Sequence, residues 1–141
     1  MKGKKVLKWL IVPLLALMIV VWYRIPVKAL GGIRTDRVAK IEIFDGNTGY
    51  EVDVTSPEQI RSITDNLSSV KVKRDGVSLF RMGYRFRMVF LDANGQELGK
   101  LILNAPDTVR KDPFFYRTTG DDTLCYDEIW NIFDGSHGYI H

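Results

Sequence analysis

Residues 82–90, MGYRFRMVF, alternate between large apolar side chains and smaller or charged ones. The apolar side chains occupy every second position: Met82, Tyr84, Phe86, Met88 and Phe90. Arg85 and Arg87 lie between them, and successive side chains of a β-strand point to opposite faces of a sheet. The segment therefore predicts a strand with one buried and one solvated face.

The flanking segments extend this sheet in both directions along the chain. Residues 38–54 predict a hairpin, because Ile41 and Ile43 alternate with polar side chains before the turn DGNTG at 45–49. Val52 and Val54 resume the apolar face after that turn. Further strands are expected from residue 70, over 98–103 after the turn DANG at 92–95, and over 114–119.

Two amphipathic segments predict helices. Ile60, Ile63 and Leu67 recur at helical spacing over residues 57–68, which are preceded by Ser56 in the run Ser-Pro-Glu-Gln at 56–59. A second apolar stripe lies between the acidic residues at 121–122 and Gly135. The expected order is β-β-α-β-β-β-β-α, an α+β domain over residues 38–135 with a mostly antiparallel sheet, helices packed on one face and a tail over 136–141.

The N-terminal segment has a different character. Residues 9–23, WLIVPLLALMIVVWY, carry no charge, and four lysines precede them. This pattern predicts a membrane helix within residues 1–23 whose N-terminus stays in the cytoplasm. Residues 24–37 are then a linker, and residues 31–141 are extracytoplasmic in a single-pass protein of the cell membrane. The alternative is a cleaved signal peptide, with cleavage after Ala29 and a secreted product.

The net charge of +3 divides unevenly along the chain. Residues 1–30 contain six basic and no acidic residues, which leaves 14 basic against 17 acidic residues in 31–141. The exported part is therefore mildly acidic, and its overall charge argues against a nucleic-acid partner. One cysteine excludes an intramolecular disulfide framework.

Several short runs, KIEI at 40–43, SPEQI at 56–60, GYRF at 83–86 and FLD at 90–92, resemble the small exported YhfM-like domains of Gram-positive bacteria. The resemblance covers most of residues 38–133. It implies an exported α+β domain and no catalytic residues. The chain departs from the many lipoproteins among such domains, because no lipid-acceptor cysteine follows its apolar leader.

A basic face is the candidate contact site. Alternation places Lys71 with Lys73 on one side of their strand, and Arg85 with Arg87 on one side of theirs. If the two strands are neighbours, the four cations share a surface that suits an anionic lipid, a cell-wall polymer or an acidic partner. The alternative is that these cations pair across strands with the acids of the first hairpin, Glu42, Glu51 and Asp53.

The sequence lacks the short motifs that mark phosphate loops, nucleophile elbows, zinc proteases and dithiol sites. We therefore expect no catalytic, cofactor-binding or metal-binding residues, and no enzyme. The expected function is a non-catalytic, membrane-anchored domain that binds an envelope or membrane protein. The alternative is a module that binds anionic lipid or cell-wall polymer through the basic strand face.

Overall fold

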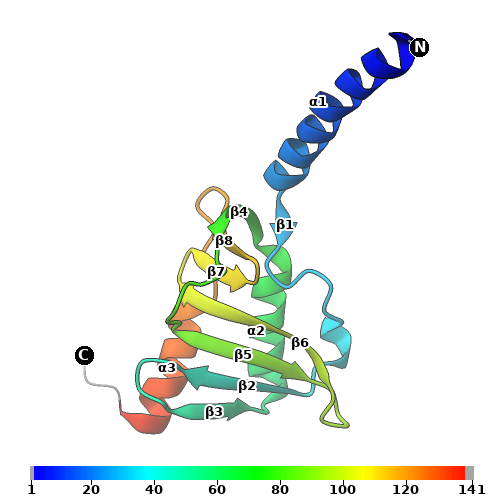
Figure 1. Cartoon of the computed structure of the whole chain (residues 1–141). Helices are drawn as coiled ribbons and strands as arrows, with labels where there is room; N and C mark the ends of the chain where they lie inside the picture. Colours follow the sequence, from blue (N-terminus) through cyan, green and yellow to red (C-terminus); the bar gives the residue numbers. More distant parts are fainter. Residues whose placement is uncertain (1, 139–141) are drawn as a thin grey trace.

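The computed structural model describes residues 2–138. Its centre is one sheet of eight strands with two helices on one face, and a third helix projects from the domain (Figure 1). The helices are α1 (Lys2–Arg24), α2 (Pro57–Ser69) and α3 (Tyr126–His137), with a short 3-10 turn at Thr35–Arg37. The strands are β1 (Val27–Lys28), β2 (Lys40–Asp45), β3 (Glu51–Val54), β4 (Lys71–Val77), β5 (Phe86–Leu91), β6 (Glu97–Ala105), β7 (Thr108–Lys111) and β8 (Phe114–Thr118).

The strands are arranged in the order β1-β4-β8-β7-β6-β5-β2-β3, and every neighbouring pair is antiparallel. The predicted hairpin is β2–β3, in which Ile41 pairs with Val54 and Ile43 with Val52. The α+β class with a mostly antiparallel sheet is confirmed.

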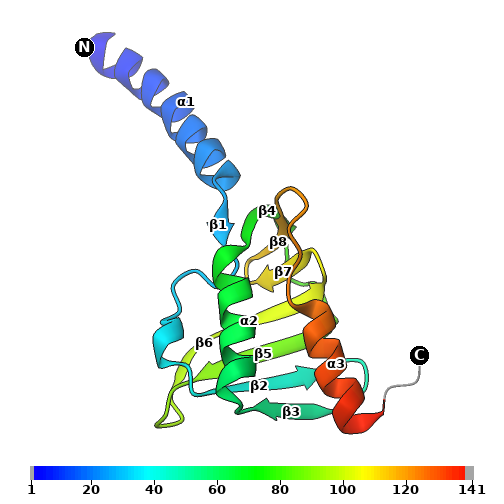
Figure 2. The same cartoon turned by 180° about the vertical axis from the view of Figure 1, so that it is seen from behind.

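Helices α2 and α3 cross the same face of the sheet (Figure 2). Their apolar stripes supply Ile60, Ile63 and Leu67 from α2, and Ile129 and Phe133 from α3, all buried. The Phe133 ring stacks on Phe86 of β5 with 5.3 Å between ring centres. Burial of apolar surface between helices and sheet is the main stabilising contribution in such a two-layer domain. Within residues 2–138 the opposite face of the sheet carries no helix, and we call it the open face (Figure 1).

Strand β5 begins at Phe86, four residues later than the sequence predicts. Met82 is 98 % exposed instead of continuing the buried face. The backbone explains the difference, because Phe80 and Gly83 have φ angles of 64° and 88°. Such angles are incompatible with an extended strand, so the expected strand at 82–85 is wrong and these residues belong to a loop.

Two strands lie where the sequence predicts none. Strand β7 forms a narrow hairpin with β8, and β1 pairs with β4 inside the expected linker 24–37. Directly after β1, Ala29 and Leu30 are 1 % and 3 % exposed. Their N–H groups donate to the carbonyl oxygens of Val70 and Leu67. The middle of this segment is therefore part of the domain core and does not act as a free spacer.

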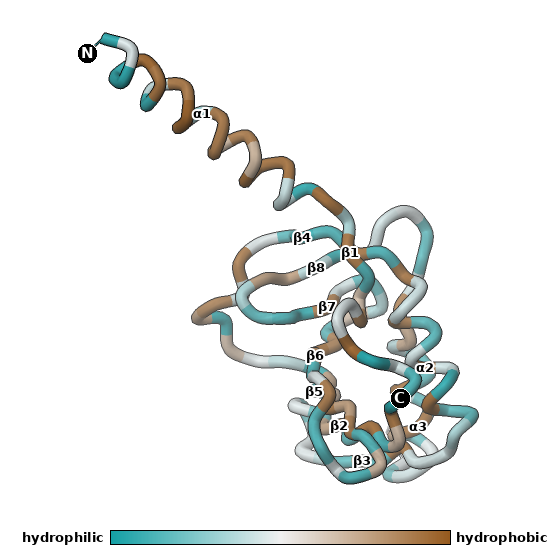
Figure 3. The backbone as a smooth tube through the Cα atoms, turned by 90° about the vertical axis from the view of Figure 1, so that its right-hand side faces the viewer, coloured by the Kyte–Doolittle hydropathy of each residue, from teal (hydrophilic) through white to brown (hydrophobic). Residues whose placement is uncertain are grey.

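Helix α1 is long and apolar enough to cross a membrane, and none of its described residues is buried. A signal sequence near an N-terminus has the same properties. Seen from the side, α1 leans toward the strands and away from α2 and α3 (Figure 3). At the other end of the chain, α3 continues to His137, beyond the expected start of the tail at 136, and residues 139–141 of that tail lie outside the described residues.

Candidate binding surfaces

The structure does not bring the four predicted cations together. Lys71 and Lys73 lie on β4, Arg87 lies on β5, and Arg85 immediately precedes β5. Strands β8, β7 and β6 separate β4 from β5 in the sheet. The condition for a shared patch of four cations, neighbouring strands, is therefore not met.

Arg85 belongs to the interior and not to a solvent face. Its guanidinium is 3.2 Å from the carboxylate of Asp45, and the two side chains are 14 % and 0 % exposed. It also lies 4.6 Å from the centre of the Trp130 ring on α3. Asp45 accepts further hydrogen bonds from the Asn47 N–H and the Thr48 hydroxyl. Arg85 thus fastens the β2–β3 turn to the start of β5, and breaking such a buried pair is costly.

A row of side chains crosses the open face from β2 to β8. The strand register places the following residues directly opposite one another in turn: Phe44, Arg87, Ile102, Arg110 and Phe115. The Arg87 guanidinium lies 5.1 Å from the centre of the Phe44 ring, and the Arg110 guanidinium lies 5.8 Å from that of Phe115. Cations and aromatic rings therefore lie on either side of a central aliphatic side chain along this row.

A hollow of about 330 Å³ lies beside this row, and its lining includes Arg87, Lys100, Ile102, Arg110 and Asp112. Arg110 donates to Asp112 at 2.8 Å, and this hydrogen bond is the main reason that the pKa of the Asp112 carboxyl is lowered. Within residues 2–138, neither Arg87 nor Lys100 forms a salt bridge. Lys100 also attracts the Asp112 carboxylate at longer range, which contributes to its lowered pKa. The hollow therefore has two cations that lie beyond ion-pair distance of any acid in the described chain, one from each of two adjacent strands.

Sequence reasoning found Arg87 but missed Lys100 and Arg110. Lys100 follows Gly99 inside β6 with no basic neighbour, and Arg110 lies in β7, one of the two strands that the sequence does not predict. Their proximity to Arg87 depends on the register of three strands. No local pattern in the sequence contains that information.

The junction between α1 and the sheet is a second distinctive region. Arg74 of β4 stacks on the Trp22 ring and donates to the Trp22 carbonyl oxygen at 3.0 Å. The N–H of Gly76 donates to the Tyr23 hydroxyl at 3.0 Å. The Phe114 ring packs edge-on against the rings of Trp22 and Tyr23. The last turn of the helix is thus attached to the sheet by stacking and hydrogen bonds together.

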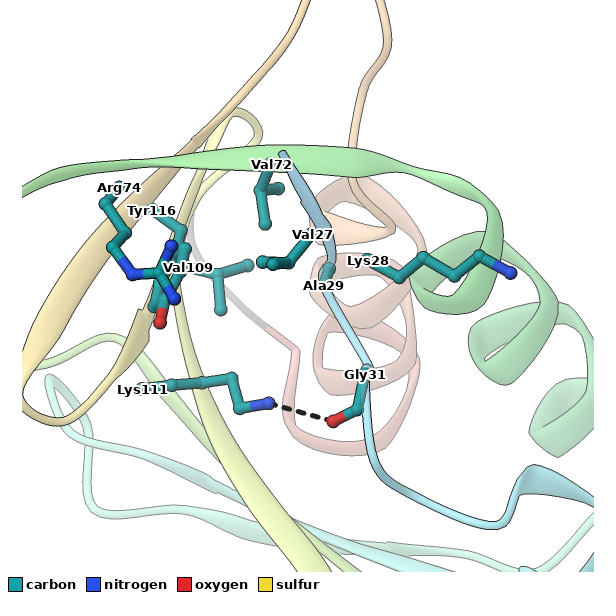
Figure 4. A pocket seen from close by; sticks show the side chains of 9 residues that line it. All are labelled: Val27, Lys28, Ala29, Gly31, Val72, Arg74, Val109, Lys111 and Tyr116. Atoms are coloured by element: carbon teal, nitrogen blue, oxygen red, sulfur yellow. Dashed lines mark hydrogen bonds between the residues drawn. The ribbon is translucent and has the colours of Figure 1, made fainter. Parts of the chain in front are cut away.

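Beside β1 the junction forms a partly open pocket of about 210 Å³ (Figure 4). Apolar side chains of Val27, Val72 and Val109 line it on the core side, and Lys111 extends into it. The Lys111 ammonium donates to the Gly31 carbonyl oxygen at 3.2 Å, and burial lowers its pKa. Lys111 thereby holds the segment after β1 against β7, a structural role at the joint.

Two further features concern the lone cysteine and the metal-ligating side chains. Burial raises the pKa of the Cys125 thiol to about 12, so almost no thiolate exists near neutral pH and the thiol is a poor nucleophile. Among residues 2–138, no three His, Cys, Asp or Glu side chains are grouped so as to hold a metal ion.

Comparisons of the chain with protein-family models, with curated proteins and with solved structures find no match. The functional argument therefore proceeds from the geometry of these surfaces.

Proposed function

We propose that the chain is a single-pass membrane protein with a cytoplasmic N-terminus and a non-catalytic extracytoplasmic domain. Its open sheet face binds an acidic segment of another envelope or membrane protein. The observation that carries the proposal is the hollow on that face, where Arg87 and Lys100 lie beside apolar side chains and form no ion pair within residues 2–138.

The anchoring rests on α1 and on the buried segment after β1. Four lysines precede the apolar stretch, which favours a cytoplasmic N-terminus. Trp22 and Tyr23 at the other end suit the membrane–water interface. Cleavage after Ala29 would create a charged amino group at Leu30, which is 3 % exposed. Placing an unpaired charge in a core is expensive, so this burial favours retention of the helix over the secreted alternative.

The binding surface rests on composition and access. Arginine and aromatic residues, phenylalanine included, are enriched at the centre of protein–protein interfaces, and the row on the open face contains two of each. Clustered cations favour acidic segments through charge-assisted hydrogen bonds. Because α1 leans to the side of the open face (Figure 3), a partner that is itself anchored in the membrane can reach this face.

The alternative function, binding of anionic lipid or cell-wall polymer by Lys71, Lys73, Arg85 and Arg87, has less support. It requires four cations on one surface, whereas Arg85 is largely buried in an ion pair and three strands separate the others. Lys71 and Lys73 are nevertheless useful, since they lie on the sheet well away from the hollow and provide matched controls.

The proposal is tested by site-specific photo-crosslinking in native membranes with the full-length chain. A photo-reactive amino acid at Ile102 should capture one abundant protein. The same group at Asn131, an exposed position on α3, should not. Capture of the same set of proteins from both positions, or of none from Ile102, would overturn the proposal.

Charge reversal then tests whether the captured protein is bound through the cations of the hollow. The variant R87E/K100E should reduce the Ile102 crosslink at least tenfold, because it reverses both of these cations in the hollow. The variant K71E/K73E makes the same change in net charge elsewhere and should leave the crosslink within about twofold of the parent. Equal loss in both variants would indicate general attraction of an anionic polymer or lipid instead of a specific acidic partner.

A further inference from the structure

The loop between β4 and β5 exposes an unusual amount of apolar surface. We call residues 77–82, which are the last residue of β4 and the first five residues after it, the apolar loop. Phe80 and Met82 are 100 % and 98 % exposed, and Val77 and Leu79 are about half exposed. Soluble domains rarely place several large apolar side chains together in solvent, and such groups mark a contact surface.

The apolar loop starts where α1 ends. Strand β4 is antiparallel to β1 and so runs back toward α1. Its residues Arg74 and Gly76 contact Trp22 and Tyr23 in the last turn of the helix. Val77, the first residue of the loop, follows Gly76 directly. Figure 3 shows the apolar (brown) stretches after β4 on the side of the sheet toward which α1 leans.

Hydrogen bonds hold the base of the apolar loop in place. The Ser78 N–H donates to the Pro113 carbonyl, and the Ser78 hydroxyl donates to Asp112 at 2.6 Å. Arg110 donates to the Arg81 carbonyl oxygen at 3.0 Å. The loop is thus attached to the β7–β8 turn while the side chains of Phe80 and Met82 stay in solvent. It does not fold back to bury them.

We propose that the apolar loop is a second membrane contact, which inserts Leu79, Phe80 and Met82 into the lipid interface beside α1. The inference rests on the proposed membrane anchoring and goes beyond it. The bilayer is the favoured occupant because β4, the strand that leads into the loop, contacts the last turn of the membrane helix. Arg81, exposed within the loop, suits the phosphate level, as basic residues flanking apolar ones do in interfacial segments.

Two membrane contacts and a firm joint would fix the orientation of the domain. A single helix alone allows the domain to rotate about the helix axis, whereas a helix and an adjacent inserted loop do not. Arg110 links the loop to the hollow on the open face. The contact would therefore hold the open face at a constant angle to the membrane.

The test places an environment-sensitive fluorophore at single cysteines of the full-length protein in lipid nanodiscs. Cys125 is buried and protonated, so labelling is selective for the new site. With M82C, quenchers attached to lipid acyl chains should reduce the fluorescence at least twofold. The label on N94C, in the exposed β5–β6 turn at the far end of the sheet (Figure 1), should stay unquenched. The label on L15C in α1 reports the anchor.

Each outcome is decisive. Quenching at Met82 that falls to the Asn94 level in the variant L79S/F80S/M82C supports the inference, because the label alone then does not insert. Quenching at Leu15 without quenching at Met82 overturns the loop contact and leaves the anchor intact. Absence of quenching at both sites overturns the anchoring as well. A label at Met82 that is shielded from water but not quenched by lipid overturns the inference in favour of a protein contact.

Discussion

The guanidinium of Arg74 lies 3.8 Å from the centre of the Trp22 ring, which joins the strand next to β1 to the last turn of α1. The same side chain donates to the Trp22 carbonyl oxygen at 3.0 Å, in the last turn of the helix. Within residues 2–138 this oxygen otherwise accepts only a long backbone hydrogen bond of 3.4 Å, from the Ile25 N–H. One arginine thus both stacks on the helix and caps part of its end. This contact is one of several that hold the helix against the sheet, together with those of Gly76 and Phe114.

Removal of this contact should loosen the joint. The variant R74A loses a cation–π interaction worth about 0.5–2 kcal/mol, together with the hydrogen bond to Trp22. Pulsed electron spin resonance between labels at Leu15 and Asn94 should show a broader distance distribution. The variant R117A, which removes an exposed ion pair with Asp75 on the same strands, should leave it unchanged. Equal distributions in R74A and the parent would contradict the capping role.

The Asp45–Arg85 pair should dominate the local stability of the β2–β3 hairpin. The variant D45N removes a fully buried carboxylate charge that lies 3.2 Å from the Arg85 guanidinium, and we expect a loss of about 3 kcal/mol in the free energy of unfolding. The matched variant E42Q on the same strand removes a solvent-screened pair with Lys40, whose side chains are 33 % and 35 % exposed, and should cost much less. Denaturant unfolding in detergent measures both. Similar losses in the two variants would contradict the prediction that the Asp45–Arg85 pair stabilises the fold more than the Lys40–Glu42 pair.

The Cys125 thiol should respond to pH through burial. Its pKa in the folded chain is raised from an ordinary 9.0 to about 12. The unfolded state therefore loses its thiol proton first as the pH rises. The contribution of the buried, protonated thiol to the free energy of unfolding is complete below pH 9 and is lost between pH 9 and about 12. The difference in unfolding free energy between the parent and C125A should shrink across that range.

A thiol reagent gives an independent measurement at a pH of about 8, where an ordinary exposed thiol is partly ionised. In the native chain Cys125 should react with the reagent only as fast as unfolding of the surrounding structure exposes it. A cysteine introduced at the exposed position Ser136 should react without this delay. Rapid modification of Cys125 in the native chain would show that the thiol is accessible.

Phe80 should lower the stability of the folded chain. Its left-handed backbone is unfavourable for any residue with a Cβ, and its side chain contributes no packing because it is fully exposed. The variant F80G should therefore raise the free energy of unfolding by up to about 1 kcal/mol. The neighbouring variant L79G, without positive φ to relieve, should lower it. A destabilising F80G would mean that the ring packs within the folded chain.

Much of this architecture can be predicted from local patterns in the sequence. The hairpin at 38–54 and the helix at 57–68 are predictable because period-two and helical spacings are strong there. Strand β7 is not, because Thr108–Lys111 has one buried residue, Val109, and too few positions to establish a period. Strand β1 has only two residues and depends entirely on β4 for its strand pairing.

The candidate site is less predictable than the fold. Alternation correctly places Arg87 on the face opposite the core. It also predicts that Arg85 lies on the same face as Arg87. Arg85 instead belongs to the loop before β5, and its side chain contacts Asp45 and Trp130. Alternation also predicts strand at the end of the apolar loop, because Met82 and Tyr84 continue the pattern. Only the positive φ angles at Phe80 and Gly83 interrupt it. Such conformations depend on neighbouring segments and leave no periodic signal.

Because Ala29 and Leu30 are buried in the folded domain, cleavage after Ala29 depends on whether the protease acts before the domain folds. A protease needs an extended, accessible segment in its cleft, and in the folded domain the N–H groups of both residues are hydrogen-bonded inside the core. Cutting at that point must precede folding. Slowing the folding of the domain would then increase the released fraction, and faster folding would commit more copies to the membrane. The ratio of released to membrane-anchored chains would therefore depend on the rate of cleavage relative to the rate of folding.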